Sequence, residues 1–112
     1  KIDLDVVISG TPNDRDIIKD ITKLSPKIIR LDKYYDFPNF INLCDCASII
    51  ISVDTGPAHI AAYSNTPLIW IIKSSPYAIT NKPYSKNTTT IEAKDLNSIN
   101  VDVVFKKVLE LI

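Results

Sequence analysis

The sequence predicts an α/β fold, a Rossmann-like parallel sheet with helices on both faces. Short β-branched apolar segments alternate with segments whose apolar residues recur at helical spacing, in the order β-α-β-α-β-α-β. Residues 47–53 are apolar on both faces, which is typical of a central parallel strand. In a sheet of this kind, ligands bind at the carboxyl ends of the strands.

Two strands and a helix are expected in the first part of the chain. Residues 5–9 form a short strand that ends in a turn beginning at Gly10. Residues 14–23 place three isoleucines on one stripe, with acidic residues at the start and lysines towards the end, as in an amphipathic helix. Pro26 ends this helix, and residues 27–31 form the second strand.

The middle of the chain repeats this alternation. A loop over residues 32–38 precedes a short helix over residues 38–46. The strand at residues 47–53 leads into a second helix, with Pro57 in its first turn. Residues 68–72 form the next strand.

The last part of the chain begins with a long loop over residues 73–88, which carries two prolines. Residues 89–92 form a short strand. Residues 101–112 place valine, phenylalanine, leucine and isoleucine side chains on one face of a terminal helix, and Asn100 is its expected N-cap.

Composition excludes several classes of protein. The 13 Lys and Arg residues balance the 13 Asp and Glu residues, so no net charge attracts nucleic acid. The longest apolar run, residues 68–72, is too short to be a transmembrane segment. Cys44 and Cys46 are too close for an ordinary disulfide or a zinc site, which suits reduced thiols in the cytoplasm. We expect residues 1–112 to form a single domain, excised from a longer protein.

The most informative segment lies where the strand at residues 47–53 meets the following helix. Asp54, Thr55 and Gly56 form this junction, and His59 follows in the first turn of the helix. Unpaired N–H groups and the positive end of the dipole accommodate a phosphate at such a position. The alternative is that Asp54 or Thr55 only caps the helix while His59 packs against a loop.

The segment at residues 52–62, followed by Pro67, resembles the Asp-Thr-Gly-x-x-His motif of glycosyltransferase family 9, which includes the bacterial heptosyltransferases. A Gly-x-Pro-x-acid turn that ends at Asp14, about forty residues upstream, extends the resemblance to nearly the whole chain. The resemblance implies a GT-B architecture of two Rossmann-like domains, of which this chain is the carboxyl-terminal, donor-binding one.

The resemblance also assigns roles to residues of this sequence. Asp14 matches an acidic residue that binds the ribose hydroxyls, which suits a carboxylate because it only accepts hydrogen bonds. Tyr35 falls where the family's backbone meets the adenine. The alternatives are that Asp14 is an ordinary acid at a helix start and that Tyr34 and Tyr35 are partly buried loop aromatics.

The remaining positions concern the sugar and the diphosphate. Asp54 matches a residue near the sugar, and Thr55, Gly56 and His59 match contacts to the diphosphate and sugar. Lys73 stands where the family usually has glycine. It either pairs with the diphosphate or points into solvent, and the change leaves the identity of the donor open.

These roles predict the donor-binding domain of an inverting glycosyltransferase of lipopolysaccharide core biosynthesis. The expected donor is the nucleotide sugar ADP-heptose, and the acceptor is a lipid-linked saccharide held by a missing amino-terminal domain. That domain also supplies the catalytic base, so the isolated chain is expected to be inactive. The resemblance implies no cofactor and no metal, and a location in the cytoplasm or peripheral at the inner membrane face.

Three other functions are alternatives to this one. The first is a transferase that uses another nucleotide sugar, and the second is a degenerate nucleotide-binding domain without turnover, which Lys73 supports. The third is a receiver-type signalling domain with Asp54 as phosphoacceptor. Such a domain needs a pair of acids after the first strand, where this chain has Ser9 and Gly10.

Overall fold

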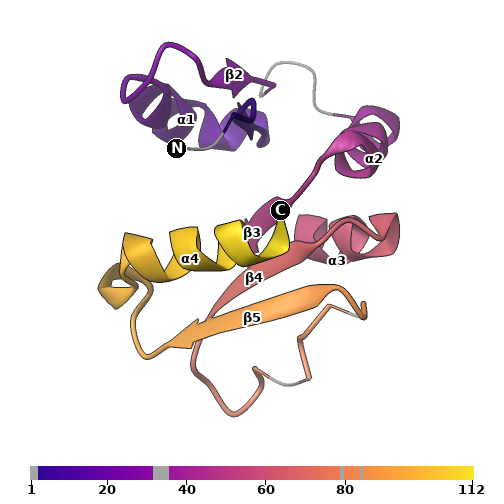
Figure 1. Cartoon of the computed structure of the whole chain (residues 1–112), viewed down its shortest axis with the longest axis vertical. Helices are drawn as coiled ribbons and strands as arrows, with labels where there is room; N and C mark the ends of the chain where they lie inside the picture. The colour runs from indigo at the N-terminus through magenta and orange to yellow at the C-terminus, as the bar shows by residue number, and fades with distance from the viewer. Residues whose placement is uncertain (1–2, 32–35, 79, 84) are drawn as a thin grey trace. The chain divides into compact units, whose positions relative to one another are not determined.

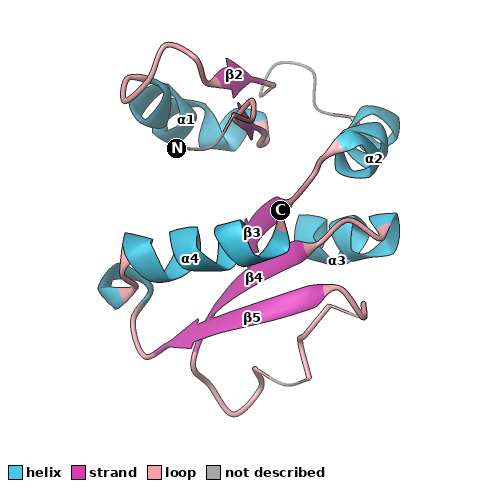
Figure 2. Cartoon of the chain, in the orientation of Figure 1, coloured by secondary structure: helices cyan, strands magenta, loops and turns pink. Residues whose placement is uncertain are grey.

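The computed structural model describes residues 3–31, 36–78, 80–83 and 85–112 (Figure 1). It divides into two compact units, Lys1–Phe40 and Ile41–Ile112, and each is considered by itself. Both contain parallel strands and helices, so the chain is α/β, as predicted (Figure 2). Among the described residues, no helix has both the length and the apolar character needed to cross a membrane.

The first unit is a parallel pair of short strands joined through a helix. Strand β1 (Val7–Ile8) pairs with β2 (Ile29–Arg30), with Val7 opposite Ile29. Between them lie the 3-10 turn Pro12–Asp14 and helix α1 (Arg15–Thr22). Both strands are shorter than predicted, because only these residues are paired in parallel ladders.

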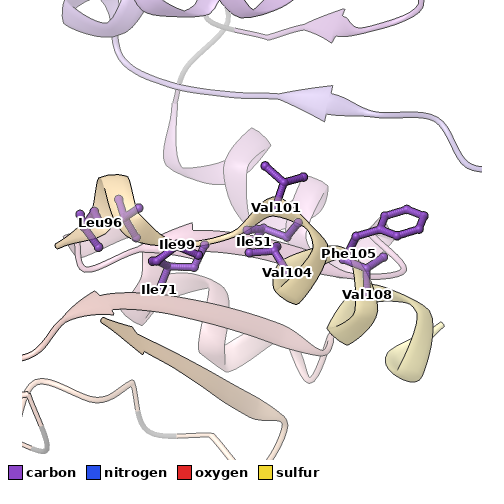
Figure 3. A pocket seen from close by; sticks show the side chains of 9 residues that line it. Ile51, Ile71, Leu96, Ile99, Val101, Val104, Phe105 and Val108 are labelled. Carbon is purple, nitrogen blue, oxygen red and sulfur yellow. The ribbon is translucent and has the colours of Figure 1, made fainter. Parts of the chain in front are cut away.

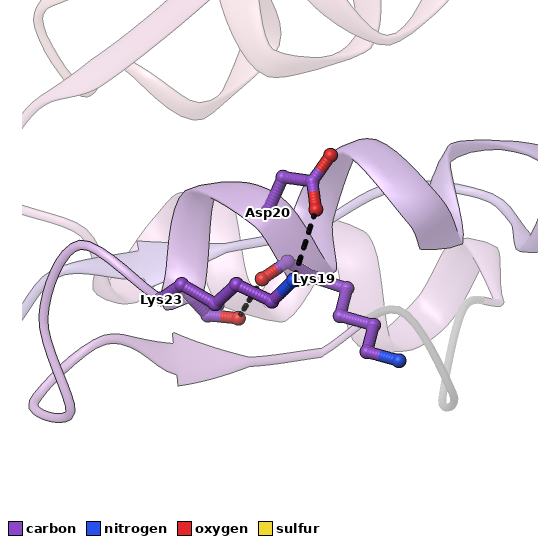
Figure 4. Close-up of polar contacts among 4 residues, drawn as sticks. Lys19, Asp20 and Lys23 are labelled. Atoms are coloured by element: carbon purple, nitrogen blue, oxygen red, sulfur yellow. Dashed lines mark hydrogen bonds and ion pairs between the residues drawn. The ribbon is translucent and has the colours of Figure 1, made fainter.

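Helix α1 is anchored by one side chain of its predicted apolar stripe. Ile18 is buried, whereas Ile17 and Ile21 remain exposed. After the helix, Lys23 Nζ lies 3.5 Å from Asp20 Oδ1, and both side chains are largely exposed (Figure 4). Because water screens exposed charges, this ion pair contributes little to stability.

The second unit contains a three-stranded parallel sheet in the order β3-β4-β5. The strands are β3 (Ile50–Val53), β4 (Leu68–Lys73) and β5 (Thr88–Ala93). The prediction that residues 47–53 form the central strand is wrong for this sheet, because β4 lies between the other two. The apolar side chains of β4 are mostly buried, whereas half of the Ile51 side chain of β3 is exposed.

Helices cover both faces of this sheet, as predicted. Helix α3 (Gly56–Ala61) places Ala58 in a buried cluster with Trp70, Ile72 and Ala78. Side chains alternate along a strand, so Ile71 points to the opposite face of β4. There it faces helix α4 (Val101–Leu111), which runs along the sheet in Figure 1.

Smaller features of the second unit agree with the sequence. Asn100 is the N-cap of α4, and its side-chain oxygen accepts the backbone N–H of Asp102 at 2.8 Å. Strand β5 exists and is longer than residues 89–92 because every residue of β4 has a partner in it. The hydroxyl of the buried Thr66 donates to the Cys44 carbonyl at 2.7 Å, which ties helix α2 (Phe37–Cys46) to the turn before β4.

Candidate functional site

The junction between β3 and α3 forms as the sequence predicts. The strand ends at Val53, Thr55 is extended with φ −142° and ψ 165°, and the helix begins at Gly56. Pro57 occupies the first turn, where its fixed φ suits a helix and its missing N–H costs no hydrogen bond. The polar residues of the junction therefore lie at the carboxyl edge of the sheet.

No side chain caps the start of α3. Thr55 is the N-cap residue, but its side chain makes no capping hydrogen bond, and its hydroxyl donates instead to the Val53 carbonyl at 3.4 Å. Within the described part of the chain, the side chains of Asp54 and His59 have neither a hydrogen bond nor an ion pair, and both are exposed. The alternative that Asp54 or Thr55 serves as a cap is therefore not realised, and the polar groups of the junction remain open to solvent.

Gly56 faces open space. A Cβ added to it would meet no heavy atom within 4 Å, and its φ is not positive. Neither the backbone conformation nor a neighbouring side chain therefore requires glycine at this position. The space in front of the first helical turn is free for a ligand to approach the backbone.

Lys73 ends β4 at the same edge of the sheet. Val53 is paired with Ile71, so Lys73 lies two residues further along the strand direction. It is exposed and makes no ion pair with the described residues. Strand alternation places its side chain on the face of Ile71, whereas α3 covers the other face. To reach an anion at the start of α3, the Lys73 side chain must bend past the carboxyl ends of the strands to the opposite face of the sheet.

Asp14 belongs to the first unit, where it has a local role. Its Oδ2 atom accepts hydrogen bonds from the Thr11 backbone N–H at 2.9 Å and from the Thr11 hydroxyl at 3.1 Å. The Asp14 N–H in turn donates to the Thr11 carbonyl at 2.9 Å. These contacts support the alternative that Asp14 is an ordinary acid at a helix start. The other carboxylate oxygen, Oδ1, has no partner among the described residues. Tyr35 lies outside the described residues.

A separate apolar pocket of about 430 Å³ lies between α4 and the sheet (Figure 3). Ile51, Val53 and Ile71 form its sheet side, and Val104 and Phe105 of α4 are among the side chains opposite. None of the residues predicted to bind a donor lines it. The sequence predicts the apolar stripe of α4 but does not predict the pocket between that stripe and the sheet.

Cys44 and Cys46 differ in environment, and neither belongs to the β3–α3 junction or lines the apolar pocket. Cys44 is buried in α2, and burial raises the pKa of its thiol, with a further increase from the charge of Asp45. Cys46 is exposed. No three His, Cys, Asp or Glu side chains in the described ranges are grouped so as to hold a metal ion.

Comparison with known proteins identifies relatives. The family model of glycosyltransferase family 9 (heptosyltransferase) matches residues 3–107. The chain is 34% identical over 95 residues to lipopolysaccharide heptosyltransferase 3 of Escherichia coli, an alignment that covers 81% of this chain. It spans only 28% of the length of that relative. No solved structure matches the chain significantly.

Proposed function

Because the chain belongs to glycosyltransferase family 9, we propose that it is the nucleotide-sugar-binding domain of a transferase, with ADP-heptose as the donor. The observation that carries this proposal is the uncapped, exposed start of α3 in front of the open space at Gly56. The residues of the Asp-Thr-Gly-x-x-His motif lie at the carboxyl edge of the sheet, and parallel sheets generally bind ligands at that edge. The acceptor is a lipid-linked saccharide of lipopolysaccharide, and the enzyme acts in the cytoplasm or at the inner membrane face.

The diphosphate of the donor is held at the start of α3. The backbone N–H of Gly56 donates to a phosphate oxygen, and the hydroxyl of Thr55 does so by giving up its 3.4 Å hydrogen bond to the Val53 carbonyl. The positive end of the helix dipole favours the charge of the phosphate. His59, one turn into the helix, donates an N–H to the same group. Asp54 lies near the sugar and accepts hydrogen bonds from its hydroxyls.

For the nucleoside, two roles are proposed from the family resemblance. Asp14 accepts a hydrogen bond from the ribose, and the backbone near Tyr35 contacts the adenine. The exposed carboxylate of Asp14 supports the first of these roles. Lys73 contributes positive charge at the carboxyl edge of the sheet.

The reaction is a direct displacement. A base outside this chain takes the proton of an acceptor hydroxyl, whose oxygen bonds to the anomeric carbon from the side opposite the nucleotide. The bond from that carbon to the diphosphate oxygen breaks, and ADP leaves with its electron pair. His59 and the backbone N–H of Gly56 stabilise the negative charge that develops on the leaving diphosphate.

A second candidate is a nucleotide-binding domain without turnover. Lys73 is the observation that favours it, because its side chain lies on the face opposite α3 and occupies the position usually held by glycine. The variant Lys73→Gly in the full-length protein discriminates between the two. A clear rise in donor turnover would indicate a degenerate site, whereas measurable turnover by the unsubstituted protein that is unchanged or lower in the variant would support an active enzyme.

The main test is calorimetric titration of the full-length protein with ADP, UDP and GDP at low ionic strength. We expect selective binding of ADP, and a loss of about 1–3 kcal/mol in the variant His59→Ala, the scale of a hydrogen bond to a charged group. Tyr63→Ala is the matched control, because Tyr63 is 81% exposed just beyond the same helix. Preference for UDP or GDP would change the donor, and no binding of any of the three would contradict the proposal.

A further inference from the structure

We infer that Thr11 is a positioning residue, which holds the Asp14 carboxylate so that only one of its oxygens, Oδ1, is presented to the donor ribose. This inference rests on the proposed function and deepens it by naming what makes the site prefer a ribonucleotide. It depends on contacts within the first unit alone.

Both donor groups of Thr11 bind the same carboxylate oxygen. The backbone N–H lies 2.9 Å and the hydroxyl 3.1 Å from Asp14 Oδ2. A carboxylate oxygen has two lone-pair positions, so these two hydrogen bonds occupy Oδ2 fully. Oδ1 accepts no hydrogen bond from any described residue, and the side chain is exposed. Oδ1 is therefore the atom left for a ligand.

Gly10 leaves the room that the Asp14 side chain occupies. A Cβ at Gly10 would lie 3.0 Å from both Cβ and Oδ2 of Asp14, and 2.8 Å from Cδ1 of Ile18. Ile18 is 2% exposed, so it has little room to retreat. The Asp14 side chain thus lies close over the backbone of Gly10, with Oδ2 turned towards Thr11. The carboxylate is oriented before any ligand arrives.

A fixed carboxylate with one free oxygen should recognise a ribose hydroxyl more strongly than a mobile one, because less conformational freedom is lost on binding. Loss of the Thr11 hydroxyl would leave Oδ2 held by the Thr11 backbone N–H alone and would give the side chain more freedom to rotate. Discrimination between ribose and deoxyribose would then fall, while contacts to the diphosphate would remain. This pattern separates positioning from a general loss of stability.

The test compares the binding of ADP, 2′-deoxy-ADP, 3′-deoxy-ADP and inorganic pyrophosphate by the full-length protein. We expect the wild type to bind ADP about tenfold or more tightly than at least one deoxy form, the scale of one hydrogen bond to a charged group. Asp14→Asn should abolish this preference, Thr11→Val should reduce it several-fold, and Thr11→Ser, which keeps the hydroxyl, should restore it. Affinity for pyrophosphate should be unchanged in all three.

Thr22→Val is the matched control. Its hydroxyl donates to the Lys19 carbonyl at 2.9 Å in the same unit, so the substitution removes a local hydrogen bond without touching Asp14. Full ribose preference in Thr11→Val would overturn the positioning role and leave the proposed function standing. Equal binding of ADP and both deoxy forms by the wild type would overturn the positioning role and the ribose contact of Asp14, but would leave nucleotide-sugar binding standing. No binding of ADP by the wild type would overturn both.

Discussion

The substitution Gly56→Ala separates a ligand contact from a structural role. The added methyl group would meet no atom within 4 Å, and the backbone conformation of Gly56 is one that alanine adopts freely. Replacing glycine by alanine at such a position stabilises a protein by about 0.4–1 kcal/mol, because the unfolded chain has fewer conformations to lose. For a chain of 112 residues, this corresponds to a rise of roughly 2–4 °C in Tm.

Donor binding should change in the opposite direction. The methyl group would occupy the space through which a phosphate oxygen approaches the Gly56 N–H. Losing one hydrogen bond to a charged group costs about 1.5–3 kcal/mol, or roughly a ten- to hundredfold weaker affinity for ADP. The variant is thus expected to be more stable and to bind less well. A residue with only a structural role does not give this combination.

The measurements are thermal unfolding followed by circular dichroism and calorimetric titration with ADP. Gly10→Ala is the control, because its Cβ would lie 2.8 Å from Ile18 Cδ1 and should lower Tm. A Gly56→Ala variant that gains stability and keeps full ADP affinity would refute a ligand in this space. A variant that loses stability would refute the description of the space as open.

Four further predictions concern the second unit. Thr66→Val should lower the free energy of unfolding by about 1–3 kcal/mol, measured by urea titration, because it leaves the Cys44 carbonyl without its buried partner. Asn100→Ala should cost about 1 kcal/mol in the same assay, since the α4 cap is lost, and an unchanged midpoint would contradict this role. Iodoacetamide should modify Cys46 in the folded protein but Cys44 only on unfolding. Because the folded pKa of Cys44 is raised above 9.0, stability should begin to fall as pH rises past 9.0 towards the folded pKa, and this slope should vanish in Cys44→Ala.

Local sequence signals predicted the elements and the family well. Pro57 and the preceding apolar run placed the β3–α3 junction, and Asn100 correctly indicated where α4 begins. These features depend on neighbours in the chain, so a single sequence is enough to find them. The resemblance to glycosyltransferase family 9 is confirmed over residues 3–107.

Features that depend on distant pairing were not predictable in the same way. An apolar run does not show how many strands lie beside it, so the sequence predicts for residues 47–53 the central place that β4 occupies in the second unit. The face on which Lys73 lies follows from the alternation along β4 and from which face α3 covers. The contact between Thr11 and Asp14 was not predicted, because a turn sequence does not say which way a carboxylate rotates.

The burial of Trp70 gives the protein a spectroscopic probe at a useful place. It is the one tryptophan of the chain and is 1% exposed, in contact with Ala58 of α3. Its indole N–H has no hydrogen-bond partner among the described residues, so water entering this cluster would gain a bond there. Any opening of α3 would thus shift the emission to longer wavelength. Fluorescence therefore reports on the helix that carries the candidate site.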